Sequence, residues 1–127
     1  MPLKILVVDD SALTRKAIKR IVTMLELETE EFFEAENGRE ALDIMQRETV
    51  DLVLADLNMP EMGGIEMIYH MRGQEETKSI PVVVVSTESS TTRIEGLLAH
   101  GATDYLHKPF TPEQIREVIN RTLGVKT

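Results

Sequence analysis

The chain has 127 residues, 42% of them hydrophobic, which suits one domain with a buried core over residues 1–127 and no output domain. The net charge is -8 and the basic residues form no long stripe, so nucleic acids and anionic membranes are disfavoured as partners. Cysteine is absent, which excludes disulfides and thiol chemistry. No apolar run approaches the roughly 20 residues of a membrane span, and no signal-peptide pattern is present. We therefore expect a cytoplasmic protein.

The first third of the chain predicts two strands and two helices. Residues 3–8 are almost continuously aliphatic, as in a buried parallel strand, and they end in Asp9 and Asp10. Ser11 can cap a helix. Helical spacing predicts its apolar face at Leu13, Ala17, Ile21, Met24 and Leu25. The basic residues Arg15, Lys16, Lys19 and Arg20 fall largely on other faces, which we interpret as solvated, with a docking surface as the alternative. An edge strand is predicted near residues 31–35 and a turn at 37–38, followed by a helix with an apolar stripe at Ala41, Leu42 and Met45.

A short apolar strand at residues 52–55 leads directly to Asp56. The turn-forming stretch that follows contains Pro60 and the pair 63–64, both glycine. A short helix is then marked by Ile65, Ile68 and Met71 or Arg72. In open parallel sheets, ligands bind at the carboxyl ends of the strands, because the loops leaving that edge diverge. Asp56 is therefore the first candidate for a functional residue.

The last third predicts two more strands and two more helices. Residues 80–85 form an apolar strand with Pro81 near its start, and the strand runs into Ser86. A weakly patterned helix is predicted at 89–100 and ends at Gly101. Residues 102–106 predict the last strand, followed by residues 107–110, His-Lys-Pro-Phe. The segment 111–114 is a capping box that opens a final helix with Ile115, Val118, Ile119 and Thr122 on one side.

Strict alternation of five strands and five helices predicts an α/β fold of the (βα)5 type, with a doubly wound parallel sheet covered by helices on both faces. If the first and third strands are neighbours, Asp9, Asp10 and Asp56 converge on one crevice. Ser86 and Lys108 then leave the ends of two further strands within reach of it. Each residue alone has an ordinary explanation as a cap or a surface group. Their joint position at the ends of four strands favours a functional site.

Three carboxylates this close would repel one another unless a cation lay among them. A hard divalent ion, Mg²⁺ or alternatively Mn²⁺, suits oxygen ligands, and the backbone carbonyl of Asn58 is a further candidate ligand. An aspartate beside such an ion and an opposed lysine is a competent nucleophile toward phosphorus. These residue types therefore indicate phosphoryl chemistry at Asp56.

The chain resembles response-regulator receiver domains of the single-domain chemotaxis-regulator type over essentially its whole length. The resemblance is carried by residues 7–11 (Val-Val-Asp-Asp-Ser), residues 56–60 (Asp-Leu-Asn-Met-Pro) with Gly64, Ser86 after the valine run, Tyr105, and residues 108–110 (Lys-Pro-Phe). It implies a flavodoxin-like sheet of strand order 2-1-3-4-5. Two departures are Gly63, which makes a glycine pair, and the polar His107 at a strand end.

The resemblance further implies a role for each residue of this site. Asp56 would accept a phosphoryl group from a histidine kinase or a phosphotransfer protein of a two-component system. Chemotaxis or motility control, a phosphorelay shuttle and an adaptor role are the alternatives for its pathway. Mg²⁺ would be bound directly by Asp10, Asp56 and the Asn58 carbonyl, with Asp9 acting through water. Lys108 and Ser86 would bind phosphoryl oxygens, and Asn58 and Glu88 would tune dephosphorylation. The Lys108–Pro109 bond would be cis.

The same resemblance implies a switch. Movement of Ser86 would let Tyr105 turn inward and change the surface made by the fourth helix, fifth strand and fifth helix, where a downstream protein would bind. The alternative for Tyr105 is a half-buried packing residue. We expect a monomer, with dimerisation on phosphorylation as the alternative. The protein would catalyse only its own phosphorylation and dephosphorylation.

Two other function classes compete with this interpretation. A stand-alone Mg²⁺-dependent phosphatase of the haloacid dehalogenase type would place its nucleophile and second acid one residue apart after the first strand, whereas Asp9 and Asp10 are adjacent here. A flavodoxin-like cofactor binder would cradle a phosphate in its first loop, where these two acids would repel it.

Overall fold

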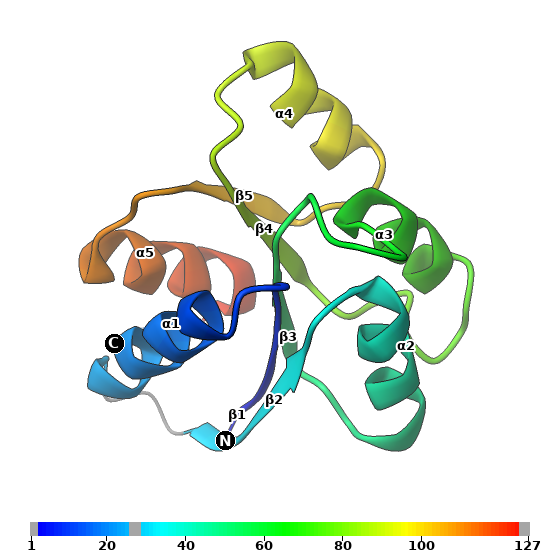
Figure 1. Ribbon diagram of the computed structural model, residues 1–127, viewed down its shortest axis with the longest axis horizontal. Coiled ribbons are helices and arrows are strands. Elements are labelled where there is room, and N and C mark those ends of the chain that lie inside the picture. The colour runs from blue at the N-terminus through cyan, green and yellow to red at the C-terminus, as the bar shows by residue number, and fades with distance from the viewer. Residues whose placement is uncertain (1–2, 26–28, 125–127) are drawn as a thin grey trace.

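The computed structural model describes residues 3–25 and 29–124. Within these residues, five strands alternate with five helices (Figure 1). In chain order they are β1 (Leu3–Val8), α1 (Ala12–Met24), β2 (Thr29–Ala35), α2 (Gly38–Arg47), β3 (Leu52–Ala55), α3 (Gly64–Arg72), β4 (Val82–Ser86), α4 (Thr91–Ala99), β5 (Asp104–His107) and α5 (Pro112–Leu123). The strands are parallel in the order β2-β1-β3-β4-β5, so the predicted fold class is confirmed. None of the described helices has the length and apolarity needed to cross a membrane.

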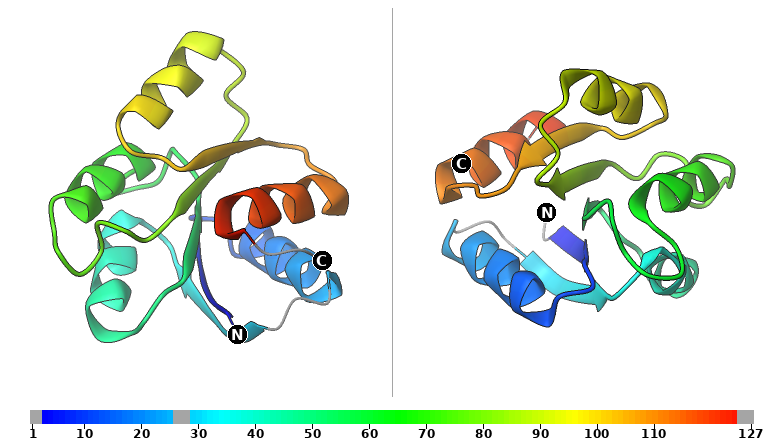
Figure 2. Two further views of the ribbon diagram at one scale, coloured as in Figure 1. Left: turned by 180° about the vertical axis from the view of Figure 1, so that it is seen from behind. Right: turned by 45° about the horizontal axis from the view of Figure 1, so that its top comes forward.

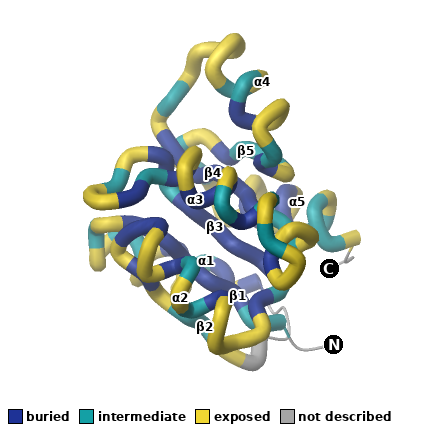
Figure 3. Tube along the Cα trace, turned by 90° about the vertical axis from the view of Figure 1, so that its right-hand side faces the viewer, coloured by how far each residue is buried: buried dark blue, intermediate teal, exposed yellow. Residues whose placement is uncertain are grey.

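Helices cover both faces of the sheet, with α1 and α5 on one face and α2, α3 and α4 on the other (Figures 1 and 2). Alternate residues of β1 face opposite layers because strand side chains alternate. Ile5 and Val7 pack with α1 and α5, whereas Leu6 and Val8 pack with α2 and α3. The strands are accordingly the most buried part of the chain, while the outer sides of the helices are exposed (Figure 3). This two-sided burial explains the nearly continuous apolar runs of β1, β3 and β4.

Side-chain caps start four of the helices, α1, α2, α4 and α5. The Ser11 hydroxyl accepts from the Thr14 N–H at 3.2 Å, which starts α1. In the capping box of α5, the Thr111 hydroxyl accepts from the Gln114 N–H, and the Gln114 side chain accepts from the Thr111 N–H. The box and the apolar face predicted for the last helix are confirmed, with Ile115, Val118 and Ile119 buried. Asn37, expected in a turn, caps α2 through Glu40 N–H.

The predicted apolar face of α1 is only partly right, because Leu25 is buried and Ile21 packs against the core whereas the other three predicted residues are exposed. Leu13 is 80% exposed, Met24 is 63% exposed and Ala17 is also exposed, whereas Ile18, Val22 and Leu25 are buried. The helix carries two apolar stripes, and the stripe that meets the sheet and α5 is the one that is buried. The predicted inward position of Ile65 on α3 is wrong, because Ile65 is 47% exposed and Met67 takes the buried position.

The strand and helix ends differ from prediction by one or two residues. β4 extends to Ser86 and β5 to His107, because these two residues are paired in the ladder. The predicted helix at 89–100 begins instead at Thr91, where the Ser90 hydroxyl accepts from the Arg93 N–H. Gly101 follows that helix with φ +115°, a conformation that glycine adopts at little cost. Ser86 is therefore held by the sheet rather than by a loop.

Candidate functional site: an acidic cluster at the carboxyl edge of the sheet

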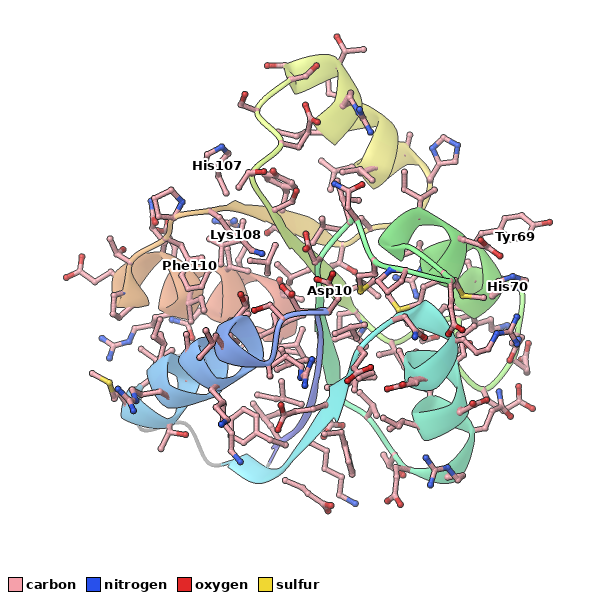
Figure 4. The ribbon with its side chains drawn as sticks, in the orientation of Figure 1. Asp10, Tyr69, His70, His107, Lys108 and Phe110 are labelled. Atoms are coloured by element: carbon pink, nitrogen blue, oxygen red, sulfur yellow. The ribbon has the colours of Figure 1, made fainter. Side chains whose placement is uncertain are left out.

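The ladder brings the ends of β1 and β3 to the same level of the sheet. Val8 pairs with Ala55, so the next residues, Asp9 and Asp56, leave the two strands side by side. The Asp56 N–H donates to the Val8 carbonyl at 2.9 Å, and the Asp9 N–H donates to the Ala35 carbonyl at 3.0 Å. Both acids are thus fixed by backbone hydrogen bonds of the sheet edge. Figure 4 shows Asp10 at the end of β1 and Lys108 after β5.

Three carboxylates gather at this edge. One oxygen each of Asp9, Asp10 and Asp56 lies within 4.8 Å of the other two. Asp9 is only 3% exposed, Asp56 is half-buried and Asp10 is exposed. The predicted convergence is therefore present, with the cluster open to solvent on the Asp10 side.

The protein already binds both oxygens of Asp9. The Ser11 N–H donates to Oδ1 at 2.9 Å, and Lys108 Nζ lies 3.2 Å from Oδ2. Lys108 Nζ also lies 3.7 Å from Asp56 Oδ2, so this one ammonium group faces two carboxylates. The Lys108 N–H donates to the Ser86 carbonyl at 2.7 Å, and the Lys108–Pro109 peptide bond is cis. These contacts hold the Lys108 side chain, which follows directly after β5, beside the carboxylates of Asp9 and Asp56.

Asp56 lies in an environment that opposes its ionisation. Burial raises the pKa of its carboxyl, and the negative charges of Asp9 and Asp10 raise it further. The Leu57 N–H, which donates to Oδ1 at 2.8 Å, and the Lys108 ammonium lower this pKa in part. Burial is the largest of these effects. A cation near the three acids would counter the repulsion, so the donor set of carboxylate oxygens fits a hard divalent ion.

Ser86, Glu88 and Tyr105 form a hydrogen-bonded group beside the cluster. The Ser86 side chain is buried, and its hydroxyl accepts from the Glu88 N–H at 3.3 Å. The half-buried Tyr105 hydroxyl shares its proton between the backbone carbonyls of Ser86, at 3.1 Å, and Glu88. The Glu88 carboxylate accepts from the Ser90 N–H at 2.9 Å. Tyr105 is therefore bonded to the loop that links β4 to α4.

The loop after Asp56 is attached to the start of α2. The Gly38 N–H donates to the Met62 carbonyl at 2.8 Å, and Asn37 Nδ2 donates to Glu61 Oε2 at 3.1 Å. Glu61 has φ 63°, an uncommon conformation for a residue with a side chain. Asn58 is exposed and lines, with residues of α3 and α4, a cavity of about 590 Å³. Sequence reasoning missed the Asn37–Glu61 contact, since residue 37 was interpreted only as part of a turn.

Comparison with known proteins identifies the family. The family model for the response regulator receiver domain matches residues 5–120. The chain belongs to this family.

Relatives of this receiver domain include chemotaxis proteins. A CheY homologue of Campylobacter jejuni is 37% identical over 96% of this chain and 93% of its own length. The chemotaxis response regulator CheY4 of Vibrio cholerae superposes with a TM-score of 0.86 at 34% identity, covering 96% of this chain and 99% of that one. The receiver domain of a Pseudomonas aeruginosa sensor histidine kinase, crystallised with magnesium in its active-site cleft, has a TM-score of 0.85 at 23% identity, covering 98% and 100%.

The family assignment decides between the function classes. The protein is a receiver domain of two-component systems, a class of signalling module, and its similarity to CheY homologues indicates chemotaxis. The alternative of a stand-alone phosphatase is not supported. The strand order 2-1-3-4-5, which the resemblance implied, is the order observed in the sheet.

The raised pKa of Asp56 predicts how the stability of the metal-free receiver domain depends on pH. Because the folded pKa exceeds the ordinary value of 3.8, this carboxyl favours folding while protonated, and that contribution is lost as the pH rises through the folded pKa. Asp56→Asn should therefore melt at a higher temperature than the wild type at pH 7 in the presence of a chelator. The difference should shrink as the pH falls through the raised folded pKa and vanish below the ordinary value of 3.8, where the carboxyl is protonated in both states. Thermal unfolding across pH measures this, and a less stable variant at pH 7 would contradict it.

Proposed function

We propose that Asp56 accepts a phosphoryl group from the phosphohistidine of a histidine kinase or phosphotransfer protein. The supporting observation is the position of its carboxylate, within 4.8 Å of oxygens of Asp9 and Asp10 and 3.7 Å from Lys108 Nζ. In the transfer, a carboxylate oxygen bonds to phosphorus while the bond from phosphorus to the imidazole nitrogen breaks, and the released imidazole takes up a proton. Lys108 lies where it can pair with a phosphoryl oxygen and offset its charge.

The proposal includes a divalent ion, Mg²⁺ or Mn²⁺. Asp10, Asp56 and the Asn58 carbonyl would hold it, and Asp9 would act through water because its two oxygens already accept from Ser11 and Lys108. The bound ion would neutralise charge on the transferring group. The Pseudomonas receiver domain that holds magnesium supports this assignment, as does the exposure of Asp10 to solvent.

Phosphorylation is proposed to switch the hydrogen-bonded group beside the cluster. A phosphoryl oxygen on Asp56 would accept the O–H of Ser86, which is buried at the end of β4, and would draw this hydroxyl away from the Glu88 N–H that now donates to it. Since Tyr105 is bonded to the Ser86 and Glu88 carbonyls, a shift of that loop would also move the tyrosine. Asn58 and Glu88 would then flank the phosphoryl group and influence its hydrolysis.

The output of the switch is proposed to be protein contact at the face of α4, β5 and α5. Tyr105 lies on β5 and its partner loop leads into α4, so both reach this face. The face would bind a downstream protein in a chemotaxis pathway, with the receiver domain acting as a cytoplasmic monomer or dimerising once phosphorylated.

The proposal is tested by incubating the protein with a small phosphodonor, such as acetyl phosphate, and Mg²⁺. Intact mass should increase by one phosphoryl group per chain, and a chelator should prevent the increase. The same reaction run with Ca²⁺ in place of Mg²⁺ serves as a control for ion size. A wild-type protein that gains no mass with Mg²⁺ would contradict the proposal.

A further inference from the structure

Arg15 is the least solvated of the basic residues predicted on the outer side of α1. Its side chain is only 12% exposed, although its ion-pair partner Glu34, at the end of β2, is 41% exposed. Arg15 Nε donates to Glu34 Oε1 at 2.9 Å, and Nη1 donates to the Asp9 backbone carbonyl at 2.6 Å. The guanidinium thus links the start of α1 to the ends of β1 and β2, and its assignment to a solvated face was wrong.

The carbonyl that Arg15 binds belongs to the peptide joining Asp9 to Asp10. Because a peptide unit is planar, fixing the direction of this carbonyl also fixes the following N–H and limits how Asp10 can rotate. The preceding Asp9 N–H is bound by the Ala35 carbonyl, and the Asp9 carboxylate is bound by Ser11 and Lys108. Residue 9 is therefore held on all sides, and Arg15 supplies the contact nearest to Asp10.

We propose that Arg15 is a positioning residue for the divalent-cation site, and that it acts by orienting the Asp9–Asp10 peptide so that the Asp10 carboxylate faces Asp56. The inference rests on the proposed function, because it presumes that these acids bind a cation. Groups that orient metal ligands commonly change metal affinity by about 10-fold to 100-fold when they are removed.

The charge of Arg15 and its positioning role make opposite predictions. Removing a positive charge near three acids should tighten the binding of a cation. Removing the hydrogen bond that orients the Asp10 peptide should weaken it. The sign of the change in affinity therefore separates the two roles.

The experiment measures Mn²⁺ binding to the unphosphorylated full chain, with free Mn²⁺ read by electron paramagnetic resonance. Arg15→Met should raise the dissociation constant at least about 10-fold. Arg15→Lys, which keeps the charge but loses the two-pronged geometry, should fall between this variant and the wild type. The matched control Arg20→Ala removes an exposed charge from the same helix and should bind like the wild type. Binding by Arg15→Met that equals or exceeds wild-type affinity would overturn the inference.

Two further comparisons keep the test decisive. If Arg15→Met fails to fold, as judged by thermal unfolding, Arg15→Lys still tests the inference, because it keeps the charge and a loss of Mn²⁺ affinity would then come from the lost hydrogen-bond geometry. Asp10→Asn should abolish most Mn²⁺ binding, and Arg15→Met should then have little additional effect. Wild-type protein that binds no Mn²⁺ would overturn the proposed ion and this inference together. Loss in Asp10→Asn without loss in Arg15→Met would overturn the inference alone.

Discussion

Asp56→Asn should abolish phosphorylation by a small phosphodonor, leaving no detectable gain in mass where the wild type gains one phosphoryl group. An amide matches the shape of the carboxylate but lacks the nucleophilic charge that attack on phosphorus requires. The Leu57 N–H, which donates to Oδ1, can still donate to the amide oxygen, so the backbone around residue 56 should be kept. Intact mass spectrometry after equal incubation measures the result.

The control for this variant is Asp43→Asn, which makes the same chemical change at an exposed acid on α2. It should be phosphorylated to the wild-type extent. Full modification of Asp56→Asn under the same conditions would show that another residue accepts the group, and the assignment of Asp56 would then be lost. Equal loss in both variants would indicate a general effect of net charge instead.

Gly64→Ala should destabilise the protein strongly, by on the order of 3 kcal/mol in the free energy of unfolding. A Cβ at residue 64 would lie 2.6 Å from the backbone carbonyl oxygen of Asp56 and 3.3 Å from the Leu57 Cα. Both neighbours are backbone at the end of the central strand β3, so neither can move without displacing the candidate phosphoacceptor. Urea unfolding followed by circular dichroism gives the stability, and the rate of phosphorylation should fall with it.

Gly96→Ala is the matched control within α4. Apart from the helix's own nearby backbone, no atom of the described residues lies within 4 Å of a Cβ built at residue 96, and alanine is the better helix former. This substitution should therefore stabilise the protein by about 0.5–1 kcal/mol. If Gly64→Ala were as stable as the wild type, the close approach of residue 64 to the Asp56 carbonyl would not explain the glycine at this position.

Some features of this protein were determined by local sequence alone. β1, apart from Lys4, and β3 are apolar runs, and each is followed at once by an acid, so their burial and the position of Asp9 and Asp56 could be predicted. The capping box of α5 could also be predicted, because its two hydrogen bonds form between residues three apart. In both cases the signal lies within a few residues of the chain.

Other features were decided only by the tertiary structure. The sequence of α1 allows two apolar stripes, and packing against the sheet and α5 buried Ile18 and Val22 while leaving Leu13 exposed. Arginine is a residue type that usually faces solvent. Arg15 nevertheless binds the Asp9 carbonyl and the carboxylate of Glu34, a residue 19 positions further along the chain. Such contacts depend on which segments the crossovers bring together. Residue spacing predicts which side chains share an element, but the packing of the elements determines which of their faces is buried.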